Sequence, residues 1–98
     1  MNKFGLPQKT YTIIKEYLKQ IKEIENVKIF GSRARGNFKP YSDIDLVLYG
    51  KNINEKLILH ISTELDELPT PYKFDIIDYK TIDNENLKTI IDTESLDF

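Results

Sequence analysis

The run DIDLVLY at residues 43–49 constrains the fold of this chain more than any other stretch. Its charged and apolar side chains alternate and then give way to a wholly apolar run, which is typical of a β-strand. Two other apolar runs, at 27–30 and 73–79, predict shorter strands. Three strands in 98 residues predict one small sheet, although the sequence gives neither their order nor their direction.

Helical periodicity separates these predicted strands. Apolar residues recur at spacings of three and four over 8–24 and again over 54–67, which predicts two amphipathic helices. A short last helix is expected after Asp83 or Asn84, either of which can cap its first turn. The order α-β-turn-β-α-β-α therefore predicts an α/β (α+β) fold in which a small sheet packs against helices, forming one domain over 1–98.

The composition excludes several classes of protein. Lys and Arg number 14 against 16 Asp and Glu, and this net charge of −2 argues against an extended nucleic-acid-binding surface. Because the chain has no cysteine, it can form neither disulfides nor thiolate metal sites. The amino-terminal residues lack the apolar core of a signal peptide, and no apolar run reaches membrane-spanning length. We therefore expect a cytoplasmic protein that makes no membrane contact.

A Gly-Ser pair follows the strand predicted at 27–30. Gly31 can take a positive φ and let a ligand approach the backbone, and the N–H groups of a helical turn at 32–35 would then favour an anion such as phosphate. The Ser32 hydroxyl adds a donor, and Arg33 and Arg35 add positive charge suited to phosphate oxygens. The two arginines are two positions apart, so they cannot share one helix face. The alternative interpretation is a plain β-turn with surface arginines.

Paired carboxylates open the strand at 43–49. Side chains alternate along a strand, so Asp43 and Asp45 project from the same face with Cα atoms about 6.7 Å apart. Both can reach one divalent ion or a pair of ions, and oxygen-only ligands suit Mg²⁺ or Mn²⁺. In the third strand only one of Asp75 and Asp78 can join them, because three positions separate the two; we choose Asp75 and expect Asp78 to cap a turn. The alternative interpretation is a solvated start of a strand.

The stretch GSRARG followed by SDIDLVL resembles the signature of the minimal nucleotidyltransferases of the DNA polymerase β superfamily. That signature is an apolar residue, Gly, Gly or Ser, about ten residues, and then Asp-apolar-Asp or Glu, with a later Asp on a neighbouring strand. The resemblance implies the nucleotidyltransferase fold and transfer of a nucleotide to a hydroxyl. It implies that Asp43 and Asp45 ligate two Mg²⁺ ions and that Asp75 completes the metal site and favours the attacking hydroxyl. The nucleotide-binding residues expected from the turn and the resemblance together are Gly31, Ser32, Arg33, Arg35 and Ser42.

The acceptor of the nucleotide is also suggested by the resemblance. Larger members of the superfamily hold their acceptor on an extra helical domain, and only 23 residues follow Asp75 here. Many small members are antitoxins that transfer AMP from ATP to a tyrosine of a HEPN-domain toxin, so the resemblance implies a HEPN partner and an ATP substrate. Two alternatives are an antitoxin that neutralises by binding alone and a transferase acting on a small molecule, for which a homodimer could build the pocket.

Overall fold

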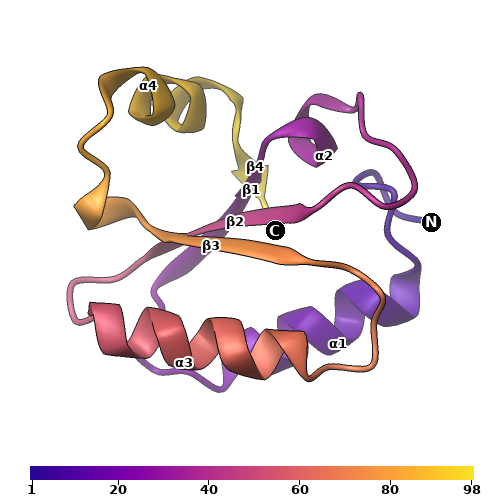
Figure 1. The fold of residues 1–98 in the computed structure, drawn as a ribbon, viewed down its shortest axis with the longest axis horizontal. Coiled ribbons are helices and arrows are strands. Elements are labelled where there is room, and N and C mark those ends of the chain that lie inside the picture. Colours follow the sequence, from indigo (N-terminus) through magenta and orange to yellow (C-terminus); the bar gives the residue numbers. More distant parts are fainter.

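The computed structural model describes all 98 residues and contains one four-stranded mixed sheet. The strands lie in the order β3-β2-β1-β4, so β2 and β1 occupy its centre (Figure 1). β1 pairs antiparallel with β2 and with β4, whereas β2 and β3 are parallel. The strand bounds are β1 Asn26–Phe30, β2 Ile44–Tyr49, β3 Phe74–Asp78 and β4 Leu96–Asp97.

Helices cover the two faces of this sheet unequally. The two longer helices, α1 and α3, lie on one face, and the single turn α2 and the helix α4 lie on the other (Figure 1). No helix of the structure has both the length and the apolar character that crossing a membrane requires. The helix bounds are α1 Gln8–Lys19, α2 Ser32–Arg35, α3 Glu55–Asp66 and α4 Glu85–Glu94, with a short 3₁₀ turn, η1, at Tyr79–Thr81.

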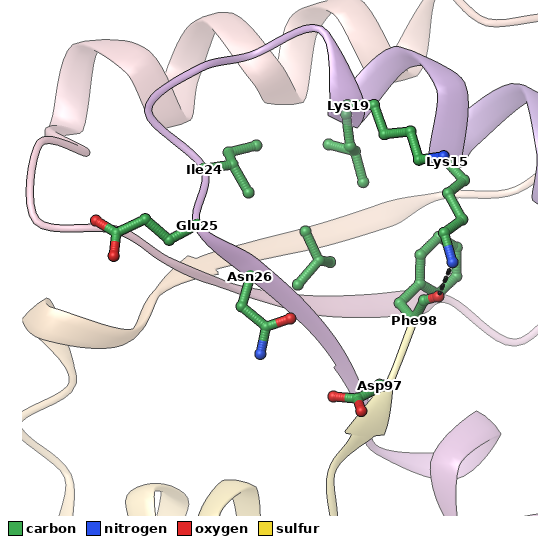
Figure 2. Close-up of a pocket in the computed structure, with 9 residues that line it drawn as sticks. Lys15, Lys19, Ile24, Glu25, Asn26, Asp97 and Phe98 are labelled. Atoms are coloured by element: carbon green, nitrogen blue, oxygen red, sulfur yellow. Dashed lines mark hydrogen bonds between the residues drawn. The ribbon is translucent and has the colours of Figure 1, made fainter.

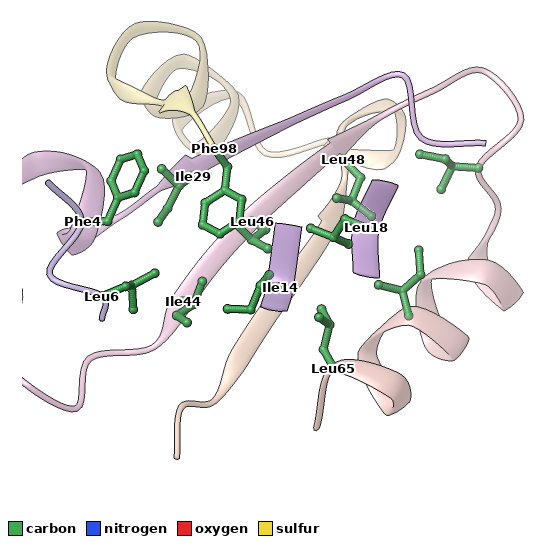
Figure 3. Close-up of a cluster of buried hydrophobic side chains, with 12 residues drawn as sticks. Phe4, Leu6, Ile14, Leu18, Ile29, Ile44, Leu46, Leu48, Leu65 and Phe98 are labelled. Atoms are coloured by element: carbon green, nitrogen blue, oxygen red, sulfur yellow. The ribbon is translucent and has the colours of Figure 1, made fainter. Parts of the chain in front are cut away.

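The main hydrophobic core lies between the sheet and the α1 and α3 helices. It contains 12 buried side chains, and every second residue of β2 points into it, namely Ile44, Leu46 and Leu48 (Figure 3). A smaller cluster of three buried residues, Phe30, Val47 and Ile91, packs on the opposite face beneath α4. Alternate side chains of β2 therefore pack into the main core on one face of the sheet and into the smaller cluster on the other face.

Side-chain caps mark the first turns of two of the predicted helices, α3 and α4. The side chain of Asn54 accepts a hydrogen bond from the Leu57 N–H at 2.8 Å, and that of Asn84 accepts one from Leu87 at 3.1 Å. The prediction that the first helix runs to residue 24 is wrong. It ends at Lys19, because the following backbone makes i→i−3 hydrogen bonds that turn the chain back toward β1. Its last apolar residues, Ile21 and Ile24, still pack on the main core, which is why the periodicity continues past the helix.

The fourth strand is absent from the sequence prediction. β4 pairs with Lys28 and Ile29 of β1, and the side chain of the following residue, Phe98, is buried in the main core. The Tyr11 hydroxyl donates a hydrogen bond to the Phe98 carbonyl at 2.6 Å, which ties this segment to α1. A strand of two residues has no readable periodicity, so only the tertiary structure reveals it.

Candidate active site

The Gly-Ser turn connects β1 directly to α2. Gly31 has φ +74, a conformation that side chains disfavour, and a Cβ atom added to it would collide with the carboxylate of Asp45. The single turn α2 begins at the next residue, Ser32, so its first N–H groups have no intrahelical acceptor. This position therefore needs glycine for two reasons, and it places free donors beside a carboxylate.

Strand register brings the carboxylates to the same part of the sheet. Asp45 lies between Phe30 of β1 and Asp75 of β3, each its direct partner across the ladder. Asp43 precedes β2 by one residue and shares the face of Asp45 by alternation. Both Asp43 and Asp75 are exposed, whereas Asp45 is partly buried. All three lie on the face that carries α2 and α4, away from the main core.

The electrostatics show that these groups interact. The pKa of Asp45 is raised to about 6, first by burial and then by the neighbouring carboxylates Asp75 and Asp43, in that order. The positive charges of Arg33 and Arg35 oppose this shift without cancelling it. The site thus holds more negative charge than its own arginines neutralise.

The three carboxylates fit a divalent cation in their chemistry, but their side chains do not surround one position. No three His, Cys, Asp or Glu side chains are near enough to one another to enclose a metal ion as they stand. The side chains of Asp43 and Asp75 are nevertheless exposed and make no hydrogen bond or ion pair within the protein, so they are free to turn toward Asp45. A set of carboxylate oxygens with unneutralised charge is what Mg²⁺ prefers. The geometry provides an open set of ligands on one sheet face.

Arg35 and Ser42 lie at the edge of this site. The Arg35 guanidinium is exposed and pairs with the Glu94 carboxylate of α4 at 3.6 Å. Ser42 precedes Asp43, and its Oγ accepts a hydrogen bond from the Lys39 N–H at 2.8 Å, which leaves the hydroxyl hydrogen free to donate. Sequence reasoning missed Glu94, because nothing in the local pattern connects α4 with a residue 59 positions earlier.

Arg33 occupies a different environment from Arg35. Its side chain is 1% exposed, and it donates hydrogen bonds to the carbonyls of Phe4 at 2.8 Å and Ser42 at 2.9 Å. The guanidinium also lies against the rings of Phe38 and Tyr72. The prediction that Arg33 binds nucleotide disagrees with this structure, since the guanidinium is shielded from solvent and bound to backbone oxygens. The spacing indicated that only one arginine could face the ligand, but not which one.

Asp78 has the structural role that the sequence suggested. It is buried, it accepts a hydrogen bond from the Lys80 N–H at 3.1 Å, and it caps η1. The Lys80 ammonium pairs with the same carboxylate at 3.1 Å and also donates to the carbonyls of Gly50 and Ile53. The expectation of a turn cap is confirmed.

A separate hollow of about 510 Å³ lies between α1 and the β1–β4 edge of the sheet. Figure 2 shows Lys15 reaching the carbonyl of Phe98 there, at 3.1 Å, with Asp97 and Asn26 on the strand side. None of the three principal cavities of the molecule is lined by Asp43, Asp45 or Asp75. The carboxylate site therefore lies outside these three cavities.

A glycine turn beside strand carboxylates, on a small mixed sheet, defines the nucleotidyltransferase class. The family model described as "Polymerase beta, Nucleotidyltransferase" matches residues 12–96. The probable protein adenylyltransferase MntA of Haemophilus influenzae is 31% identical over 80 residues, which cover 81% of this chain and 69% of that protein. The chain therefore belongs to the polymerase β nucleotidyltransferase family, among its minimal, MNT-type members.

Solved structures share the fold at low sequence identity. A crystal structure of a toxin–antitoxin complex with AMP-PNP matches with a TM-score of 0.71 and 19% identity, over 90% of this chain and 70% of that one. The MNT antitoxin complex with a tri-AMPylated HEPN toxin from Shewanella oneidensis matches with a TM-score of 0.64 and 17% identity, over 90% and 66%. These likenesses confirm the predicted nucleotidyltransferase fold, and the chain is a nucleotidyltransferase.

Proposed function

We propose that this chain transfers AMP from ATP to a tyrosine hydroxyl of a HEPN-domain toxin and thereby acts as its antitoxin. The observation that carries the proposal is the Gly31–Ser32 turn in contact distance of Asp45, which itself faces Asp75 across the sheet. The names of the relatives support the choice of acceptor, because one is a probable protein adenylyltransferase and another structure holds an AMPylated HEPN toxin.

In the proposed reaction the carboxylates hold the metal ion and act on the attacking hydroxyl. The tyrosine oxygen attacks the α-phosphorus of ATP, the bond to the bridging oxygen breaks, and pyrophosphate leaves. Mg²⁺ held by Asp43 and Asp45 would neutralise phosphate charge and make the hydroxyl more acidic. Asp75 is the carboxylate farthest from the glycine turn, so it would accept the hydrogen bond of the attacking hydroxyl and take its proton.

The glycine turn and its neighbours are assigned to the phosphates. The N–H groups at the start of α2 and the Ser32 hydroxyl would bind the β- and γ-phosphate oxygens. Arg35 would exchange its contact with Glu94 for a phosphate oxygen, which costs little because the pair is exposed. Ser42 would donate its free hydroxyl hydrogen.

The test is a transfer assay that uses ATP labelled at two different positions. The protein is incubated with MgCl₂ and a purified HEPN-domain protein, with either α- or γ-labelled ATP. Adenylylation moves the α-label to the partner and leaves the γ-label in pyrophosphate, and a Tyr→Phe series in the partner locates the acceptor. Chelation of Mg²⁺ with EDTA should stop the transfer.

Two results would contradict the proposal. If the γ-label moved, the protein would be a kinase. If no label moved and the Asp43→Asn, Asp45→Asn double variant still neutralised the toxin, binding alone would account for the antitoxin effect. The Asp66→Asn variant, on the exposed carboxyl end of α3, is the matched control and should transfer AMP as the wild type does.

A further inference from the structure

An exposed tyrosine stands next to the metal-binding carboxylates. Tyr41 is 82% exposed, and no other aromatic side chain of the protein is comparably exposed. Only Ser42 separates it from Asp43. The ring is largely free of packing contacts, so its face is available to a ligand.

The backbone that carries Tyr41 is held rigidly. It occupies the third position of a β-turn, Lys39-Pro40-Tyr41-Ser42, closed by the Ser42 N–H donating to the Lys39 carbonyl at 3.0 Å. Proline is well suited to the second position of such a turn. The Ser42 Oγ closes the same turn a second time by accepting from the Lys39 N–H. Two hydrogen bonds therefore fix four residues.

The buried guanidinium of Arg33 holds this turn by hydrogen bonds to its carbonyl oxygens. One of its nitrogen atoms, Nη2, donates to the carbonyl of Pro40 at 3.4 Å and to that of Ser42 at 2.9 Å, which are the residues on either side of Tyr41. Burial lowers the pKa of Arg33, so the folded chain bears a cost in holding this charge. The buried guanidinium of Arg33 therefore stabilises the loop that carries the exposed side chain of Tyr41.

We propose that Tyr41 is the surface on which the base of the bound nucleotide stacks. The proposal rests on the proposed function, because it assumes phosphates at the Gly31–Ser32 turn and a cation at Asp43 and Asp45. Tyr41 and Asp43 are two positions apart, so their Cα atoms lie no more than about 7 Å from each other, and the ring is within reach of a base whose phosphates occupy that site. None of the three principal cavities is lined by these carboxylates, and a preformed ring face needs no pocket.

Stacking has a consequence for specificity. Every base has a π-face, so a ring platform binds without reading the hydrogen-bonding edge of the base. The protein should therefore bind ATP and GTP with affinities within a few-fold of each other. Both nucleotides should lose affinity when the ring is removed.

The first experiment compares a ligand with a base and a ligand without one. Binding of MgATP and of Mg-tripolyphosphate is measured by calorimetry for the wild type, Tyr41→Phe and Tyr41→Ala. We expect Tyr41→Ala to weaken ATP binding by about 10-fold or more and to leave tripolyphosphate binding unchanged. Tyr41→Phe keeps the ring and should bind ATP as the wild type does.

A fluorescence experiment tests contact with the base directly. The chain contains no tryptophan, so Tyr41→Trp introduces a single reporter, and its emission should be quenched by MgATP but not by Mg-tripolyphosphate. The matched control is Leu59→Trp on α3, at a side chain that is 69% exposed, and its emission should not respond to either ligand.

Several outcomes would overturn the inference. Equal ATP affinities of the wild type and Tyr41→Ala would do so while leaving the proposed function intact, as would an unchanged ATP affinity with a raised KM for the toxin, which would assign Tyr41 to the acceptor. Equal loss of ATP and tripolyphosphate binding would indicate a damaged loop instead of a lost platform. Failure of the wild type to bind MgATP would overturn the proposed function itself.

Discussion

The two faces of the sheet differ in what they bury. The face beneath α1 and α3 holds 12 buried apolar side chains, whereas the face that carries α2 and α4 holds three. At the amino-terminal end of β2 this second face also holds three carboxylates, one of them partly buried. Grouping like charges is unfavourable, so a site of this kind depends on stability supplied elsewhere. One face therefore provides most of the buried apolar packing, and the other carries the proposed active site.

The central strand β2 shows this division within six residues. Leu46 and its neighbours at every second position are fully buried in the main core, while Asp45 points to the opposite face. Adjacent residues of one strand therefore serve different purposes, and substitutions at adjacent positions should separate activity from stability.

The largest expected effect is loss of transfer in Asp45→Asn. Replacing this carboxylate removes a proposed ligand of the cation, and we expect AMP transfer to fall by at least about 10³-fold, which corresponds to about 4 kcal/mol of activation free energy. The free energy of unfolding at pH 7, measured by urea titration, should stay the same or rise, because a repelled and partly buried charge is removed. A variant that lost both activity and stability would break the comparison between the faces.

The adjacent residue should show the opposite behaviour. Leu46→Ala leaves a cavity in the main core, so we expect the free energy of unfolding to fall by about 2–5 kcal/mol. The fraction that remains folded should still bind MgATP with wild-type affinity. The control is Leu59→Ala at an exposed position of α3, which should change stability by less than about 0.5 kcal/mol. A large loss of stability in this control would show that α3 contributes through more than its buried face.

Strand alternation made part of this arrangement predictable. It predicts that Asp43 and Asp45 share one face and that only one of Asp75 and Asp78 can lie on that face. The structure places Asp75 directly across from Asp45 and shows Asp78 as the cap of η1. The parallel pairing of β2 with β3, which sets Asp45 beside Asp75, could not be predicted, because nothing local in the sequence encodes strand order.

Long-range contacts explain what the sequence did not reveal. Arg33 and Arg35 are the same residue type in the same short turn, so the local sequence does not distinguish them. Arg33 is the buried one because Phe4, Phe38 and Tyr72 pack around it. The contact between Arg35 and Glu94 likewise depends on where α4 lies over the sheet. The residue types of the site were therefore predictable, but the partner of each charge was not.

Arg33 and Arg35 also separate stability from ligand binding, because Arg33 is buried and Arg35 is exposed. Arg33→Met removes the donor to the buried Phe4 carbonyl and to the partly buried Ser42 carbonyl, and we expect the free energy of unfolding to fall by about 2–4 kcal/mol. Binding of Mg-tripolyphosphate, which reports on anion contacts alone, should be unchanged in the folded protein. Weaker tripolyphosphate binding without loss of stability would restore Arg33 to the nucleotide site.

Arg35→Met should give the reverse result with a smaller magnitude. Its only ion pair is exposed, so we expect the free energy of unfolding to change by less than about 1 kcal/mol. Removal of a charged phosphate contact should weaken MgATP and Mg-tripolyphosphate binding by about 10-fold, as measured by calorimetry. Glu94→Gln, which frees Arg35 without removing it, is the matched control and should not weaken either ligand.

Asp45 should also make the stability of the protein depend on pH. The pKa of this carboxyl is raised from 3.8 to about 6, so between these values the folded chain keeps a proton that the unfolded chain has lost. The contribution of Asp45 to the free energy of unfolding is therefore full below pH 3.8 and is lost as the pH rises toward 6. Other carboxyl groups titrate in the same range, so the informative quantity is the difference between wild type and Asp45→Asn in urea titrations without Mg²⁺. That difference should change in favour of the variant as the pH rises from 4 to 6.5, and a constant difference would mean that burial and the neighbouring carboxylates do not raise the pKa of Asp45.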